Sequence, residues 1–120
     1  MSKKIMAIAT IEILDGKLEQ FKEILVELMD NVSKTEPETL IYNWYINEEG
    51  TMCQLIEQYA NSEAAMFHAV NYAPFKPRLD ECRKVQQLVV YGSLDDNFRS
   101  MLQQNEIPLF DELMILETRP

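Results

Sequence analysis

A chain of 120 residues is long enough for one domain with a single core. Its 11 basic and 20 acidic residues give a formal net charge of −9, which disfavours binding to nucleic acids and to anionic membrane surfaces. The apolar segment near the N-terminus, residues 5–13, is too short for a membrane-spanning helix and no small-residue cleavage site follows it, so we predict a cytoplasmic protein without a membrane partner.

The residues that usually hold metals and cofactors are sparse. Cys53 and Cys82 form neither a CxxC motif nor a Cys/His cluster with metal-ligand spacing, so we expect both to be reduced and structural. Gly16, Gly50 and Gly92 are too far apart for a G-x-G-x-x-G dinucleotide motif. We therefore predict no metal site and no flavin or nicotinamide cofactor.

The first half of the chain predicts a strand, a helix and a hairpin. Residues 5–13 alternate with apolar side chains on both faces, which is typical of a central strand covered by helices on one side and by another layer, such as a second subunit, on the other. A long amphipathic helix follows and ends before Pro37. Residues 39–47 and 52–59 then predict antiparallel strands joined by a short turn that contains Gly50.

The second half predicts two helices and a strand. Residues 62–72 predict a helix that Pro74 and Pro77 interrupt, a short helix runs through Arg83, and residues 85–93 predict the fourth main strand. The resulting order, β-α-β-β-α-β, indicates an α+β ferredoxin-like domain over residues 1–93, with both long helices on one face of an antiparallel sheet. The other face of the sheet is left bare.

Residues 94–120 predict a helix–strand arm of the same domain. Phe98, Met101 and Leu102 are expected to point inward from a short helix, and residues 107–117 predict a strand. Because a two-layer domain offers no obvious place for this arm on its helical face, we expect it to cross the exposed sheet face or to reach a partner subunit.

One strand–helix unit brings together three side chains that can carry protons. Glu57 and Tyr59 are two residues apart and project from one face of a strand, and His68, the only histidine, lies on the following helix. Ala65 and Ala69 flank His68 on its helix face and leave room beside the imidazole, which suggests a cavity wall. The alternative is a hydrogen-bonded structural histidine within the core.

These residues resemble those of the antibiotic biosynthesis monooxygenase domain family. Its members typically have a tyrosine-rich second strand, here residues 40–45, a third strand ending in Glu-x-aromatic, here Glu57 and Tyr59, and a histidine nine residues later, here His68. The resemblance covers roughly residues 5–92. It implies a homodimeric α+β barrel in which two ferredoxin-like sheets pack face to face.

The resemblance also implies an activity. The family includes cofactor-independent oxygenases that convert aromatic phenols, anthrones or quinols to quinones, and on that basis we predict a monooxygenase that oxidises a small aromatic quinol or phenol with O2. His68 would accept the hydroxyl proton, and Tyr59 and Tyr72 would contact the substrate. Glu57 would orient His68, or would instead form a structural ion pair with an arginine, Arg78 or Arg83.

Two further residues, Asn43 and Trp44, are candidates for substrate binding. Trp44 would hold the aromatic ring and Asn43 would bind a carbonyl or a nascent peroxide. They point to opposite faces of one strand, so both line the same cavity only if a bulge intervenes.

Two other functions stay open. An isomerase acting on a keto or phosphorylated signal compound would use the same histidine, with cations from the cluster Lys76, Arg78, Arg83 and Lys84. A non-enzymatic dimer would use the cavity to bind a hydrophobic ligand, and His68 would then bond to a backbone carbonyl. A heme-degrading enzyme is disfavoured because residues 75–82 contain no histidine.

Overall fold

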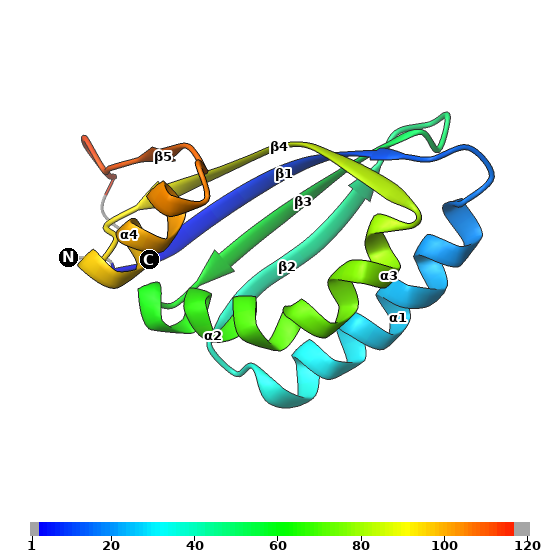
Figure 1. The fold of residues 1–120 in the computed structure, drawn as a ribbon. Helices are drawn as coiled ribbons and strands as arrows, with labels where there is room; N and C mark the ends of the chain where they lie inside the picture. The colour runs from blue at the N-terminus through cyan, green and yellow to red at the C-terminus, as the bar shows by residue number, and fades with distance from the viewer. Residues whose placement is uncertain (1–2, 117–120) are drawn as a thin grey trace.

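The computed structural model describes residues 3–116, which form an open five-stranded sheet with helices on one face (Figure 1). Antiparallel strands β1 (Ile5–Ile13), β2 (Thr39–Ile46), β3 (Met52–Tyr59) and β4 (Arg83–Gly92) lie in the order β2-β3-β1-β4, and the short β5 (Leu109–Phe110) runs parallel to β4 at the edge. The expected ferredoxin-like α+β fold is confirmed.

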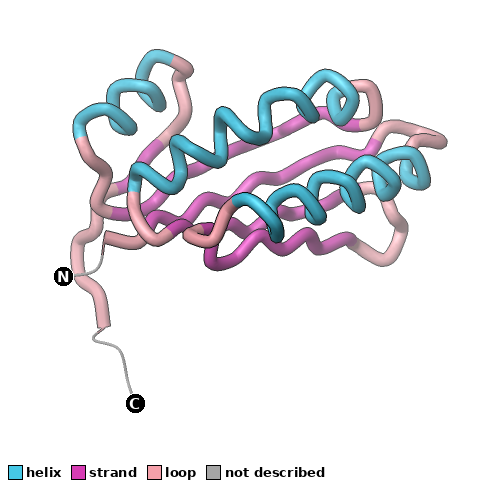
Figure 2. Tube along the Cα trace, turned by 90° about the horizontal axis from the view of Figure 1, so that it is seen from below, coloured by secondary structure: helices cyan, strands magenta, loops and turns pink. Residues whose placement is uncertain are grey.

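The two long helices connect these strands as the sequence indicates, but the short helix predicted to run through Arg83 ends at Asp80, and Arg83 is the first residue of β4. Helices α1 (Leu18–Thr35) and α2 (Ser62–Tyr72) lie side by side under the sheet (Figures 1 and 2). The 3-10 helix η1 (Ala73–Phe75) and helix α3 (Lys76–Asp80) lead back to β4, and α4 (Asp96–Gln104) follows it. No helix within residues 3–116 is both long and apolar enough to cross a bilayer.

The central position of β1 explains why both of its faces are apolar. Its odd-numbered residues, Ile5 to Ile13, are buried beneath the helices. Its even-numbered residues are only partly buried, and Ile8 lies in register with Ile56 of β3 and Val89 of β4. We call this second surface, centred on Ile8, Ile56 and Val89, the open sheet face.

Helix α1 supplies most of the core between sheet and helices. Its buried residues, Phe21, Ile24, Leu28 and Val32, recur at the helical period. Cys53 and Cys82 are buried and free in the same layer, as expected.

The arm after β4 differs from the expectation in two respects. Its helix α4 packs on the helical side of the sheet, where Phe98 and Leu102 are buried against the end of α2, rather than crossing the open sheet face. A hydrogen bond from the Asp95 amide to the Ser62 hydroxyl (3.0 Å) ties the beginnings of α4 and α2 together. Helices α1 and α2 leave apolar residues of β1 and β4 uncovered at this end, and α4 covers them.

The strand predicted for residues 107–117 is also wrong over most of its length. Only Leu109–Phe110 pair with β4, and residues 111–116 are not a strand; residue 117 lies outside the described residues. Residues 113–116 are apolar, which is why the sequence predicted a strand here, but they are exposed in the single chain and pair with no strand among the described residues.

Candidate functional site

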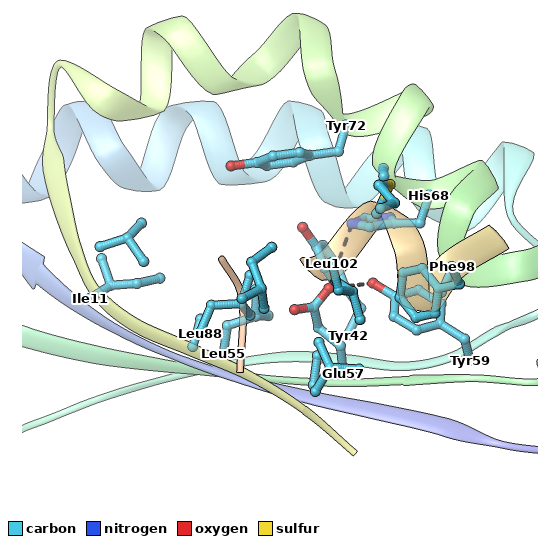
Figure 3. A pocket seen from close by; sticks show the side chains of 18 of the residues that line it. Ile11, Tyr42, Leu55, Glu57, Tyr59, His68, Tyr72, Leu88, Phe98 and Leu102 are labelled. Carbon is cyan, nitrogen blue, oxygen red and sulfur yellow. Dashed lines mark hydrogen bonds and ion pairs between the residues drawn. The ribbon is translucent and has the colours of Figure 1, made fainter. Parts of the chain in front are cut away.

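A cavity of about 210 Å³ lies between the helical face of the sheet and helices α2 and α4 (Figure 3). Small residues make the space: Ala7 and Ala9 from β1 face Ala65 and Ala69 from α2. Most of the remaining wall is aliphatic or aromatic. The polar side chains that line the cavity are Tyr42, Glu57, Tyr59, His68, Tyr72 and Arg83.

Glu57 and Tyr59 project from the same face of β3, as their spacing predicts, and the Tyr59 hydroxyl donates a hydrogen bond to Glu57 Oε1. Glu57 is only 8% exposed, and this burial raises the pKa of its carboxyl group, although the Tyr59 hydrogen bond and the proximity of His68 oppose the shift. Burial and the neighbouring Glu57 also raise the pKa of the Tyr59 phenol. The pair is therefore biased toward its protonated forms.

His68 lies between two buried carboxyl groups. Its Nδ1 is 2.7 Å from Glu36 Oε1, and its Nε2 is 3.7 Å from Glu57 Oε1. Glu36 also accepts hydrogen bonds from the Thr39 hydroxyl (2.7 Å) and from Asn71 Nδ2 (2.5 Å). Because both oxygens of Glu36 already accept hydrogen bonds from other side chains, we assign the hydrogen of the Glu36–His68 bond to Nδ1, which leaves Nε2 facing Glu57 and the cavity.

Tyr42 contributes a hydroxyl group that has no partner. Its ring contacts the His68 imidazole edge-on at a centroid distance of 4.7 Å, and its buried hydroxyl makes no hydrogen bond within the described residues. Burial raises the pKa of this phenol, so it stays protonated. A buried hydroxyl without a partner costs about 1–3 kcal/mol, which a bound ligand with an oxygen or nitrogen atom at this point would offset.

Tyr72 and Arg83 form the other polar end of the cavity. The Tyr72 ring stacks on His68 at a centroid distance of 5.8 Å, and its hydroxyl accepts a hydrogen bond from Arg83 Nη2. Arg83 Nε donates to Asp80 Oδ1 (3.2 Å). The expected alternative for Glu57, an ion pair with Arg78 or Arg83, does not form: Arg78 pairs with Glu27 at the surface.

Asn43 and Trp44 lie outside the cavity. They occupy opposite faces of the edge strand β2, as expected, and the bulge in that strand is near Thr39 and does not change this. Trp44 packs edge-on against Phe21 at 5.8 Å, and Asn43 donates a hydrogen bond to the Tyr45 hydroxyl (3.3 Å) on the open sheet face. The structure thus brings Glu57, Tyr59, His68 and Tyr72 together and leaves these two apart.

The sequence reasoning missed Glu36 and the hydroxyl of Tyr42. Glu36 follows the last turn of α1 and precedes Pro37, so the sequence shows where the helix ends but not that the side chain turns back toward α2. Tyr42 lies on the same strand face as Trp44, and the alternation of β2 gave no reason to prefer it. Within residues 3–116, no group of three or more His, Cys, Asp or Glu residues is arranged to hold a metal ion.

Solved structures with the same architecture identify the fold. A structure of MupZ from Pseudomonas fluorescens superposes with a TM-score of 0.85 and 28% identity over 99% of this chain and 97% of that chain. A putative antibiotic biosynthesis monooxygenase from Caulobacter crescentus superposes with a TM-score of 0.65 and 20% identity over 74% of this chain and 86% of that chain. The chain has the antibiotic biosynthesis monooxygenase fold.

A variant of SnoaB, a cofactor-independent oxygenase from Streptomyces nogalater, has the same fold. Its structure superposes on this chain with a TM-score of 0.66 and 7% identity over 78% of this chain and 96% of that chain. No protein-family model matches the sequence, and no curated protein is significantly similar to it. The ferredoxin-like α+β fold of the single chain is therefore confirmed by these structures, and the homodimeric barrel that the sequence resemblance also implied stays a prediction.

Proposed function

We propose that this protein is a cofactor-independent monooxygenase that oxidises a small aromatic quinol or phenol with O2. The observation that carries the proposal is the position of Glu57 and His68, whose Oε1 and Nε2 atoms face each other across 3.7 Å at one polar end of a largely apolar cavity. Proteins with the same fold are named as monooxygenases, and one of them as a cofactor-independent oxygenase, which supports the reaction class.

The first step is removal of a hydroxyl proton from the substrate. Nε2 of His68 is the acceptor, because Nδ1 is already bonded to the Glu36 carboxylate. The imidazolium that forms lies beside the Glu36 carboxylate, which stabilises its charge. The Tyr42 hydroxyl, which has no partner within the described residues, donates a hydrogen bond to the substrate oxygen.

The second step uses the substrate as the reductant. A deprotonated quinol is electron-rich enough to reduce O2 directly, and the resulting peroxide forms on the ring. Glu57, whose raised pKa favours the neutral acid, supplies a proton to the departing oxygen. One atom of O2 stays on the ring as the hydroxyquinone, and the other leaves as water with the two hydrogens that the quinol loses.

A non-oxidative proton transfer on a keto compound is the second candidate, because the same Glu57–His68 pair would serve it. A phosphorylated substrate has less support, since Lys76 and Arg78 pair with Asp80 and Glu27 at the surface. A purely structural or ligand-storing histidine has less support too, because Nδ1 bonds to a buried carboxylate rather than to a backbone carbonyl.

Oxygen uptake by the purified protein tests the proposal, with a panel of reduced naphthoquinols and anthrones. We expect uptake above the uncatalysed rate, and a loss of about a hundredfold or more in His68→Ala and Glu57→Gln. Lys84→Ala, an exposed change at the start of β4, serves as the control and should retain the wild-type rate. Equal rates in wild type and His68→Ala would contradict the proposal, and solvent deuterium exchange into a keto compound without oxygen uptake would favour the second candidate.

A further inference from the structure

Arg83 is a buried cation that the acid–base chemistry does not use. Its side chain is 3% exposed and lines the cavity. Nε bonds to Asp80 and Nη2 to Tyr72, while Nη1 makes no hydrogen bond within the described residues. A guanidinium group has five N–H donors in a planar fork, so the group retains donors for a ligand in the cavity.

The charges around Arg83 do not cancel. Asp80 is its only acidic hydrogen-bond partner within the described residues, and Asp80 Oδ2 also accepts a hydrogen bond from Lys76 Nζ at 2.6 Å. Burial opposes ionisation of Asp80, but the hydrogen bonds from Lys76 and Arg83 hold its pKa below the ordinary value. Two cations thus share one carboxylate, and the cluster has a formal charge of +1 in a chain whose net charge is −9.

Tyr72 links this cluster to the acid–base end of the cavity. Its ring centroid is 5.8 Å from that of His68 and 5.8 Å from Arg83 Cζ, so the imidazole and the guanidinium are at most twice that distance apart. The Tyr72 hydroxyl accepts its hydrogen bond from Arg83, which leaves its own hydrogen free to donate to a ligand. In Figure 3 the Tyr72 ring extends from His68 with its hydroxyl directed away from the Glu57–Tyr59 pair.

We propose that Arg83 and the Tyr72 hydroxyl form an anchor for a carboxylate group of the substrate. The substrate is then an aromatic hydroxy acid whose hydroxyl group reaches His68 and Glu57 while its carboxylate, at the other end of the ring system, binds Arg83 Nη1. This anchor deepens the proposed function and rests on it for the position of the hydroxyl group. A bond from a buried arginine to a carboxylate is charge-assisted and selects against neutral analogues.

Ligand binding tests the anchor without any turnover. The probes are 6-hydroxy-2-naphthoate and its neutral methyl ester, which share the naphthol and differ in the charged group, and their fluorescence is titrated under argon. We expect wild type to bind the acid about tenfold or more tightly than the ester. The preference should disappear in Arg83→Met and persist in the control Arg78→Met, which removes an exposed arginine paired with Glu27.

Two further variants keep the test decisive. If Arg83→Met does not fold, Asp80→Asn replaces it. This change removes the one carboxylate that Arg83 and Lys76 share, so the preference for the acid should rise several-fold, and an unchanged or reduced preference would overturn the anchor. His68→Ala should keep the preference, because it alters only the acid–base end. Equal affinity for acid and ester in wild type, or a preference that survives in Arg83→Met, would refute the proposal.

The experiments test the oxygenase proposal and the anchor independently of each other. A wild-type protein that prefers the acid under argon but consumes no oxygen would retain the anchor and lose the monooxygenase function. A protein that oxidises neutral naphthoquinols and binds acid and ester equally would retain the function and lose the anchor.

Discussion

A single imidazole between two buried carboxyl groups, of Glu36 and Glu57, is the central arrangement of the cavity. The two groups differ in their surroundings. Glu36 accepts hydrogen bonds from Thr39, Asn71 and His68, whereas burial biases Glu57 toward the neutral acid. One carboxyl group therefore sets the orientation of His68, and the other is available for proton transfer.

Glu57 should make folding stability depend on pH. In the unfolded chain its pKa is about 4.3, and in the folded chain it is raised. As pH rises above the unfolded value, the unfolded chain releases this proton while the folded chain retains it, so the free energy of unfolding falls until the pH passes the folded pKa. The side chain in Glu57→Gln has no titrating proton, so the free energy of unfolding of this variant should rise relative to that of wild type as pH rises.

Urea unfolding of both proteins from about pH 4 to about pH 8 measures this difference. The amide can still accept the Tyr59 hydrogen bond, so the fold should be retained. Parallel stability curves for wild type and Glu57→Gln would show that Glu57 does not have a raised pKa in the folded chain.

Tyr42→Phe should separate function from stability. The hydroxyl has no partner within the described residues, so its removal should leave the free energy of unfolding unchanged or raise it by about 1 kcal/mol. Because we assign the hydroxyl to substrate binding, kcat/KM should fall about tenfold. Tyr59→Phe is the matched comparison: its hydroxyl donates to Glu57, and its loss should destabilise the fold by about 1–3 kcal/mol. A stability loss in Tyr42→Phe as large as in Tyr59→Phe would contradict this assignment.

Local spacing was sufficient to predict which residues of one strand–helix unit meet. Glu57 and Tyr59 share a strand face, and His68 and Tyr72 share a helix face, so period two and period 3.6 place all four. Glu36 and Arg83 reach the same region from the ends of other elements, and no local period relates them to His68. Their contribution depends on how α1 and β4 pack against α2, which the sequence does not encode locally.

At the scale of elements, the end of β4 controls where α4 begins. Gly92 has φ +134°, and a Cβ atom at this position would lie 2.6 Å from the Lys4 carbonyl oxygen of the chain before β1. A side chain here would push β4 away from β1 or shift the start of the arm that carries Phe98 and Leu102 over the cavity.

Gly92→Ala should therefore destabilise the fold by about 2 kcal/mol or more. Gly16→Ala is the control, because Gly16 also has positive φ (74°) but a Cβ atom there would meet no atom within 4 Å, so it should cost only about 1 kcal/mol. Chemical denaturation compares the two. Equal losses would mean that backbone conformation alone, and not crowding against β1, determines the cost.

The long elements were predictable because their patterns are strong and their partners are close in sequence. The alternation in β1 and the apolar stripe of α1 are local signals, and both elements form where expected. The strand predicted for residues 107–117 failed because alternation needs a neighbouring strand: β4 offers pairing only at Leu109–Phe110. The position of α4 could not be predicted, because it depends on the part of the sheet that α1 and α2 leave uncovered, and no local sequence pattern shows where that part is.

At the scale of the whole molecule, the open sheet face is the surface that the expected homodimer would bury. Ile8, Ile56 and Val89 form an apolar row across three strands; Ile8 and Ile56 are partly exposed in the single chain, whereas Val89 is already buried. The barrel formed by two such sheets stays a prediction. Burial of this row against a second copy would remove apolar area from water in both subunits.

Ile8→Lys should convert the protein from dimer to monomer, because a charge at the centre of a buried face has no partner. Analytical ultracentrifugation gives the mass in each case. Val26→Lys on α1, where the side chain is 71% exposed, adds the same charge on the opposite side and should leave the dimer intact. A monomeric wild type, or a dimeric Ile8→Lys variant, would show that the open sheet face is not the interface.

The distribution of cavity residues along the chain has an evolutionary consequence. The proton-carrying groups, from Glu36 to Tyr72, all precede residue 73, whereas Arg83 and most of the bulky apolar wall, including Phe98 and Leu102, come after it. Changes confined to the last third of the gene can therefore alter which molecule is accepted without altering the groups that act on it. Descendants of one ancestral sequence could diverge in substrate while inheriting the same chemistry.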